Sequence, residues 1–187
     1  MPAGRITLSA TLAGLLFLIG CRRASSEVVR QDSVPLSETV AQECSQPAYR
    51  QFDFWVGVWE VHYPDGRPAG INTITSILRG CALHEQWVSA NPPYRGESFN
   101  TFRSDTETWH QTWIDNSGGM LLLEGRYAND QMVLEGVTTD SAGAKILNRI
   151  TWSRPDSSAN RIRQHWETSR DGRSWQTDFD GLYTRKP

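Results

Sequence analysis

The stretch QFDFWVGVWEV at residues 51–61 marks a change in the character of the chain. Residues 22–46 before it are polar and show no periodicity, whereas short runs rich in Trp, Thr, Val, Ile and Phe follow it. Clusters of turn residues, such as Asp-Gly pairs, separate these runs and supply the left-handed conformations that tight hairpins need. No window of a dozen residues after residue 50 has a helical period. The stretch therefore opens a domain built from strands.

The runs between the turns predict about ten short strands at regular spacing, which is typical of an all-β sandwich or barrel. Hairpin-like connections favour an antiparallel up-and-down meander, and closing the meander removes the exposed edges that invite aggregation. We therefore expect residues 46–187 to form an all-β, antiparallel up-and-down β-barrel. The predicted strands are 54–63, 70–79, 81–89, 96–103, 107–115, 119–127, 131–139, 145–153, 161–169 and 174–185.

In two of these strands, 81–89 and 107–115, aromatic and polar side chains alternate onto the same, bulkier face. We expect this face to point inward. A dry core does not favour this mixture, because each buried polar group needs a partner. A cavity that holds water or a ligand accounts for it, and so do polar residues that satisfy one another or lie at the rim. Tryptophan walls and polar hydrogen-bonding groups form the candidate ligand site: Glu85, Trp87, Trp109, Gln111, Trp113 and Asp115.

The tryptophans are the unusual feature of the composition, with 8 in 187 residues. The same alternation places Trp175 and Thr177 on one inward face with Phe179 and Tyr183, and we expect Trp152, Trp166 and Trp175 to pack in the wall or core. Lys and Arg (19) nearly balance Asp and Glu (21). This balance argues against a nucleic-acid-binding protein, which normally presents a strongly basic face.

Residues 1–20 are typical of a secretory signal, with Arg5 ahead of an apolar run over 6–19. The ending Leu18-Ile19-Gly20-Cys21 resembles the lipobox of bacterial lipoproteins, which implies cleavage before Cys21 and lipidation of that residue. The alternative is an ordinary signal peptide followed by a chance Cys. Arg22 stands where Asp would signal retention in the inner membrane. We therefore expect a lipid-anchored envelope protein at the outer membrane, facing the periplasm, with residues 21–45 as its tether.

Two further cysteines, Cys44 and Cys81, follow the predicted lipidation site. In an oxidising compartment one disulfide between them is possible. The alternative is two separate buried thiols.

The motif Gly57-Val58-Trp59 is similar to the G-x-W motif on the first strand of lipocalins and related calycin barrels. In those proteins the Trp plugs the closed end of the barrel, and a late Arg packs over it. The resemblance implies that Arg185 stacks on Trp59 through a cation–π contact, the alternative being a solvated terminal Arg. The absence of a helical lid and the ending on a strand make the plan look more like the nitrobindin barrel.

Further segments, 80–85, 109–115 and 179–183, look like those of the DUF1579 family, an uncharacterised bacterial family of calycin-like proteins. The resemblance covers roughly residues 44–187. That family has no settled activity, so the resemblance implies a fold and leaves the function open.

The function we expect is binding of a small hydrophobic or amphipathic ligand in the barrel lumen. The alternative is an envelope protein that contacts other proteins or has a structural role, without a small ligand. Neither a G-x-S-x-G nor an H-E-x-x-H motif occurs, so we predict no enzyme, unless Glu85 and Asp115 meet across the lumen. A further alternative is a barrel that binds haem or a metal through its histidines. The histidines lie on four different strands, and His84 and His110 have outward parity, so we predict no cofactor and no metal.

Overall fold

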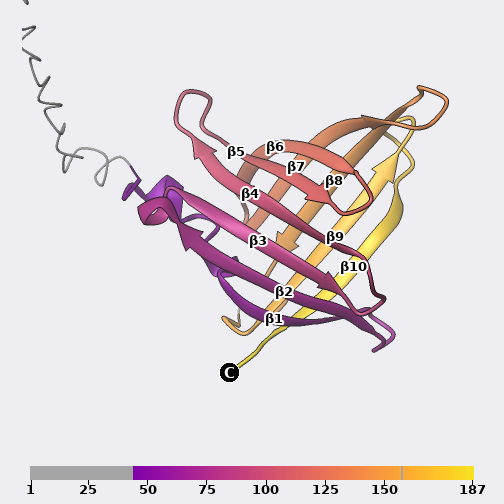
Figure 1. Ribbon diagram of the computed structural model, residues 1–187. Coiled ribbons are helices and arrows are strands. Elements are labelled where there is room, and N and C mark those ends of the chain that lie inside the picture. The colour runs from indigo at the N-terminus through magenta and orange to yellow at the C-terminus, as the bar shows by residue number, and fades with distance from the viewer. Residues whose placement is uncertain (1–43, 157) are drawn as a thin grey trace, which may run out of the picture. The chain divides into compact units, whose positions relative to one another are not determined.

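The computed structural model describes residues 44–156 and 158–187. Over these residues the chain forms a closed antiparallel barrel in which each strand pairs with the next and β1 pairs with β10 (Figure 1). This confirms the predicted fold class. The strands are β1 (Gly57–His62), β2 (Pro68–Ile77), β3 (Ala82–Ser89), β4 (Arg95–Arg103), β5 (Thr108–Asp115), β6 (Met120–Ala128), β7 (Gln131–Thr139), β8 (Lys145–Ser153), β9 (Arg161–Ser169) and β10 (Gln176–Arg185). The predicted signal peptide, Cys21 and the tether up to residue 43 lie outside the described residues.

The inward faces of β3 and β5 follow the alternation expected from the sequence. In β3 the side chains of Leu83, Glu85 and Trp87 are buried, whereas Gln86 and Val88 are exposed. The strands have this pattern because side chains alternate across a pleated strand and only one face of a barrel strand meets the interior. Seven of the eight tryptophans lie on the interior side: Trp55, Trp59, Trp87, Trp109, Trp113, Trp152 and Trp166.

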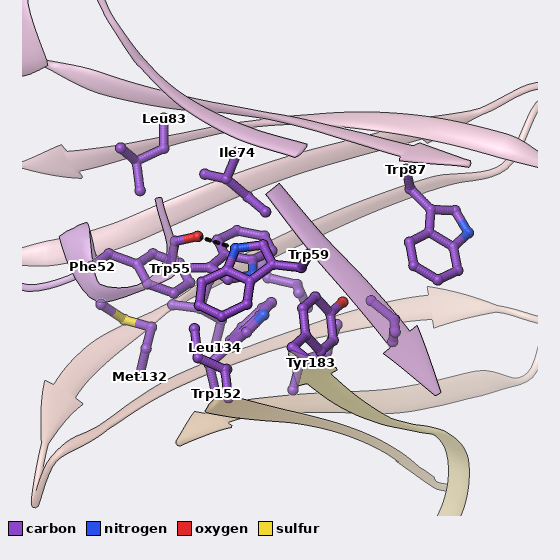
Figure 2. Close-up of a cluster of buried hydrophobic side chains, with 14 of the residues drawn as sticks. Phe52, Trp55, Trp59, Ile74, Leu83, Trp87, Met132, Leu134, Trp152 and Tyr183 are labelled. Atoms are coloured by element: carbon purple, nitrogen blue, oxygen red, sulfur yellow. Dashed lines mark hydrogen bonds between the residues drawn. The ribbon is translucent and has the colours of Figure 1, made fainter. Parts of the chain in front are cut away.

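Two short 3-10 turns, η1 (Pro47–Arg50) and η2 (Asp53–Trp55), lie at one end of the barrel (Figure 1). The ring of Phe52 stacks on Trp55 at 4.9 Å between centroids and meets the edges of Trp109 and Trp152 at 5.5 and 5.2 Å. Figure 2 shows this cluster, in which the Trp59 indole N–H donates to the Trp55 carbonyl at 2.9 Å. We call Phe52, Trp55, Trp59, Trp109 and Trp152 the plug, because they close this end of the barrel.

The expected contact between Arg185 and Trp59 is confirmed. The guanidinium carbon lies 4.2 Å from the Trp59 ring centroid, and Nη1 donates to the Val56 carbonyl at 2.9 Å. Gly57 makes room for this arrangement, because a Cβ at that position would lie 2.1 Å from Arg185 Nη1. Its φ of +145° is also one that other residues rarely adopt. The glycine of the motif is therefore required both by its backbone and by the arginine beside it.

A disulfide joins Cys44 to Cys81, which immediately precedes β3 after the short turn η3 (Leu78–Gly80). Of the two alternatives left open by the sequence, the bonded pair is the one observed. Arg50 strengthens the same junction by donating to the Gly80 carbonyl and pairing with Asp53 at 3.3 Å. Cys44, which we assigned to the tether, is thus tied to the barrel.

The predicted inward placement of Trp175 and Thr177 is wrong. A β-bulge between Thr177 and Phe179 shifts the register of β10 against β9, so that Asp178 is the extra residue. The strand alternation reverses at this bulge, and the residues before it change face. Trp175 precedes β10 and stacks under the guanidinium of Arg149, whose carbon lies 4.0 Å from the ring centroid. The inward assignment holds only from Phe179 onward.

Within the described part of the chain, no helix has both the length and the apolar character needed to cross a membrane.

Candidate functional site

A cavity of about 200 Å³ lies in the barrel on the far side of the interior from the plug. Residues near the loops 90–94 and 116–119 and the start of β10 surround it, so it approaches the end of the barrel opposite η1 and η2. Figure 2 shows Trp87, one of its lining residues, set apart from the packed plug, with Tyr183 beside Trp59. Its apolar walls are formed by Trp87, Trp113, Leu121, Ile150, Trp166 and Phe179.

The polar floor of the cavity centres on Glu85, whose side chain is 4% exposed. Asn72 Nδ2 donates to one carboxyl oxygen at 2.7 Å, and the Ser98 hydroxyl donates to the other at 2.5 Å. These partners come from β2 and β4, the two strands that flank β3. The register sets Ile74 and Ser98 directly opposite Glu85, which brings the inward side chains of three strands together.

The hydrogen bonds continue from this carboxyl around the barrel wall. Ser98 accepts from Asn100 Nδ2 at 2.9 Å, and Asn100 Oδ1 accepts from Gln111 Nε2 at 2.8 Å. On the other side, Asn72 donates to the Tyr183 hydroxyl at 3.2 Å, which donates in turn to Gln164. We call this chain of seven side chains the floor network: Asn72, Glu85, Ser98, Asn100, Gln111, Gln164 and Tyr183.

Burial changes the acidity of two groups in the floor network. Removal from water raises the pKa of Glu85 from 4.5 to about 7, and the hydrogen bonds from Ser98 and Asn72 oppose that rise. Burial, and then the nearby Glu85 carboxyl, raise the pKa of Tyr183 well above its usual value. Tyr183 therefore stays a neutral hydrogen-bonding group, whereas Glu85 can change its charge near neutral pH.

The aromatic walls depend on glycines in the neighbouring strands. A Cβ at Gly96 would lie 2.2 Å from the Trp113 ring, and one at Gly70 would lie 2.7 Å from the Trp87 ring. Each indole therefore lies across a strand position that has no side chain. The Trp87 ring meets Phe179 edge-on at 5.9 Å between centroids. These contacts hold the rings in place around an open space.

Tyr94 and Asp178 line the cavity near its open end, and both are exposed. Asp115 lies beside them at the end of β5, where Oδ2 accepts from the Tyr94 hydroxyl at 3.2 Å. Its Oδ1 accepts from the backbone of Ser117 and Gly119 at 2.8 and 3.0 Å. Although partial burial acts in the opposite direction, the hydrogen bonds led by that of the Ser117 hydroxyl lower the Asp115 pKa to about 2. The mouth of the cavity is therefore acidic.

The structure brings four of the six predicted site residues to the cavity: Glu85, Trp87, Gln111 and Trp113. Trp109 belongs to the plug instead, where its indole N–H donates to Gln51 at 3.2 Å. Asp115 holds the turn at the rim and does not join the floor network, so the two carboxyls considered for acid–base work do not form a hydrogen-bonded pair. Both interpretations of the mixed faces apply, since Glu85 and Gln111 join one hydrogen-bond network that borders the cavity and Asp115 lies at its rim.

Several polar residues that the structure places in the floor network were not identified from the sequence. Asn72, Ser98 and Asn100 are fully buried, with 0% exposure. Asn72 lies two residues before the buried Ile74, and Ser98 lies two residues before Asn100, so each pair shares one face of its strand. Polar residues on predicted inward faces are therefore the signal that could have identified them. Asp178 could not have been found this way, because the bulge that turns it toward the cavity leaves no signal in the alternation.

Three of the histidines engage groups on the outer face of the barrel. His84 stacks on Phe99 at 4.8 Å and lies 2.7 Å from Glu97, while His165 lies 2.9 Å from the Thr177 hydroxyl. His110 lies 3.5 Å from Glu124. Over residues 44–156 and 158–187, no group of three His, Cys, Asp or Glu side chains is placed to hold a metal ion.

The fold and the cavity together define a closed ten-stranded antiparallel β-barrel with a plugged end and an internal cavity. No protein-family model matches the chain, and the search of curated proteins finds no match. The resemblance to the DUF1579 family therefore stays a prediction that depends on the sequence motifs.

Proposed function

We propose that this protein binds a small hydrophobic or amphipathic molecule in the barrel cavity. The observation that supports this most strongly is the cavity itself, whose walls are aromatic and whose floor carries a few hydrogen-bonding groups. Ligand sites are typically concave and mostly apolar, with a small number of polar groups that orient the ligand. The position of the tryptophans agrees with this function, because all but Trp175 lie on the interior side.

The size of the cavity limits the ligand. Its volume of about 200 Å³ is somewhat larger than an apolar cavity of about 150 Å³ that accommodates benzene. It is smaller than the roughly 300–1,000 Å³ of sites for drug-sized molecules. We therefore infer a compact ligand, such as one ring with a short polar arm, and not a full-length fatty acid.

Native mass spectrometry of the protein purified from its own host tests this function. The wild type is expected to carry a small co-purifying molecule. Leu121→Phe, which fills the cavity, is expected to lose that molecule. Leu122→Phe changes the next residue of β6, which is 48% exposed on the outer face, and should retain it. A consistently empty wild type, together with unchanged tryptophan fluorescence across a panel of compact aromatic compounds, would rule out the function.

We further propose that the chain reaches the cell envelope and is anchored there through lipid on Cys21. The disulfide between Cys44 and Cys81 supports export, since such bonds persist mainly in oxidising compartments. Metabolic labelling with a fatty acid should mark the wild type and leave Cys21→Ala unlabelled. Sucrose-gradient separation of the membranes should place the labelled protein in the outer membrane. An unlabelled wild type, with its N-terminus elsewhere than residue 21, would overturn the anchor.

A second candidate function, contact with a partner protein, is supported by an apolar strip on the outer face. The register sets Phe99 opposite Thr112 and Thr112 opposite Leu122, and Ile114 lies opposite Met120 in the next row. Their side chains are about half exposed or more, at 51% for Phe99 and Ile114, 48% for Leu122 and 61% for Met120. Crosslinking in intact cells tests it. A protein captured by the wild type should be lost in the Phe99→Ser, Leu122→Ser double variant.

A further inference from the structure

We propose that the ligand of the barrel cavity carries a positively charged amine, held at the Glu85 carboxylate between the aromatic walls. This inference rests on the proposed function, because it names the chemical class of the molecule that the cavity binds. Three features of the cavity support it: the charges that line it, the free acceptor positions on Glu85 and the aromatic rings of its walls.

The charges that line the cavity are all of one sign. Of the twelve lining residues in the described part of the chain, two are carboxylic acids, Glu85 at the floor and Asp178 at the mouth, and none is Lys, Arg or His. Asp115 adds a third carboxylate beside the mouth, where it binds Tyr94. A ligand with its own carboxylate would meet like charge and would find no cation to pair with. A cationic ligand would find opposite charge at both ends of the site.

Glu85 retains the capacity to bind a donor. Its two oxygens each accept one hydrogen bond within the protein, from Asn72 and Ser98. An ionised carboxylate has about four acceptor positions, so about two remain for groups in the cavity. The side chains that face Glu85 from β2, β4 and β10 are neutral amide and hydroxyl groups, Asn72, Ser98 and Tyr183. His84 on the same strand points outward and pairs with Glu97. No cation of the floor network therefore neutralises this carboxyl.

The walls suit a cation as well as an apolar group. An ammonium group near the face of Trp is attracted by the electrons of the ring, and the attraction grows when water is excluded. Trp87, Trp113 and Trp166 all line the space around the floor network. A ring on the ligand would pack on the same side chains. An arylalkyl amine of compact size therefore matches both the walls and the floor.

The ligand amine and the Glu85 proton compete for the same carboxyl. Because burial raises the pKa of Glu85 to about 7, the carboxyl is mostly neutral at pH 6 and mostly charged at pH 8. An alkylammonium group keeps its charge over this range, as Lys does with a pKa near 10.4. Amine binding should therefore strengthen as pH rises from 6 to 8 and should release a proton below pH 7.

Isothermal titration calorimetry with three size-matched probes tests the inference: 2-phenylethylamine, 2-phenylethanol and phenylacetate. At pH 8 we expect the amine to bind about tenfold more tightly than the alcohol, because a charge-assisted hydrogen bond is stronger than a neutral one. Phenylacetate should bind more weakly than either. Only the amine should gain affinity between pH 6 and pH 8.

Three variants separate the carboxyl at the floor from general effects. Glu85→Gln should remove the preference for the amine and its pH dependence while retaining the alcohol. Asp178→Asn, an exposed change at the mouth, should weaken the amine alone by about two- to threefold. Glu135→Gln, an exposed carboxyl on the outer face, is the matched control and should behave as the wild type. If Glu85→Gln does not fold, the selective loss of amine affinity in Asp178→Asn still tests whether negative charge at the cavity favours the amine.

The outcomes distinguish the inference from the function on which it rests. Equal affinity for amine and alcohol, or tighter binding of phenylacetate, would overturn the cationic ligand and leave small-molecule binding intact. An amine preference that Glu85→Gln and Asp178→Asn both retain would also overturn it. Failure of all three probes to bind the wild type would overturn the inference together with the proposed compact-ligand function.

Discussion

At the scale of single residues, Glu85 is the group whose chemistry departs most from its ordinary behaviour. It lies in the interior with an exposed fraction of 4%, and its partners are neutral. Burial raises its pKa because a charged carboxyl loses more on leaving water than a neutral one. This residue therefore links the protonation of the barrel to its stability and, in our proposal, to ligand binding.

The first prediction concerns stability against pH. Between pH 4.5 and about 7 the folded protein keeps the Glu85 proton, whereas the unfolded chain has released it. The unfolding free energy contributed by this group is therefore highest below pH 4.5 and falls as pH rises to 7. The fall amounts to roughly 3 kcal/mol, from 1.36 kcal/mol for each pKa unit. Urea unfolding from pH 4.5 to 8 measures it.

Glu85→Gln should remove this dependence, because Gln resembles the neutral acid in shape. The variant is expected to be more stable than the wild type at pH 8. Glu135→Gln, which changes an exposed carboxyl on the outer face, should leave the pH profile of the wild type unchanged. A wild-type profile that rises between pH 5 and 7, or a Glu85→Gln variant with the same slope, would contradict the assignment.

The second prediction concerns Gly57. Gly57→Ala should lower the unfolding free energy by about 2–3 kcal/mol, because Ala rarely adopts a φ of +145° and its Cβ would collide with Arg185. Thermal and urea unfolding measure the loss. Gly118→Ala is the matched control, since its φ of +84° is also unfavourable but a Cβ there meets nothing within 4 Å. It should cost only about 1 kcal/mol.

A double-mutant cycle isolates the contact with the arginine. In the background of Arg185→Ala, the cost of Gly57→Ala should decrease, because the guanidinium that blocks the Cβ is gone. Strict additivity of the two substitutions would show that the loss comes from the backbone alone.

At the scale of elements, three kinds of contact attach the N-terminal turns η1 and η2 to one end of the barrel. The Cys44–Cys81 disulfide joins the segment to the start of β3, Arg50 contacts Gly80, and the Phe52 and Trp55 rings fill the barrel end. The strands next to the plug supply its other aromatic side chains, which are Trp59 from β1, Trp109 from β5 and Trp152 from β8. The closed end is therefore built from both a short segment and the strands.

The third prediction tests the disulfide in this arrangement. A Cys44→Ala, Cys81→Ala double variant should lose about 3–4 kcal/mol of unfolding free energy, as expected for a bond that spans a sequence separation of 37 residues. Urea unfolding gives the value. The wild type in excess reductant is the control and should approach the double variant. A loss below about 1 kcal/mol would mean that the plug is held by packing alone.

The positions of the strands are the feature of the structure that the sequence predicted most successfully. The ten predicted strands each overlap one observed strand, since turn chemistry and period-2 alternation are local features that the chain expresses directly. The wrong prediction for Trp175 has a local cause as well. One extra residue, Asp178, reverses the alternation of β10. A β-bulge leaves the segment looking like an ordinary strand, so the sequence pattern does not reveal it.

At the scale of the whole molecule, closure of the barrel depends on the pairing of its first and last strands. The β1–β10 pair has four register partners, from Trp59↔Arg185 to His62↔Leu182, whereas the β2–β3 pair has eight. Elements with fewer paired backbone groups open more readily. Of the pairs in the described sheet β1–β10 has the fewest register partners, with β6–β7 next at five, so we expect it to be the weakest junction.

The fourth prediction is that the barrel opens first at this junction. In hydrogen exchange measured by mass spectrometry, the amides of residues 57–62 that bond to β10 should exchange before those of 82–89. Deletion of residues 183–187 should increase exchange across β1 much more than across β7 and β8. Earlier exchange in β7 and β8 than in β1 would place the weak junction elsewhere.

The sequence by itself determined the strands, the inward faces of β3 and β5 and the motif around Trp59, because residues two positions apart share a face and turn residues end each run. Only the tertiary structure separated Trp109, which lies in the plug, from Trp87 and Trp113, which line the cavity. It also joined Cys44 to Cys81 and linked Glu85 to Asn72, Ser98 and Tyr183. These contacts depend on register and on closure of β1 against β10, which bring together residues far apart in the chain. Alternation along one strand contains no information about either.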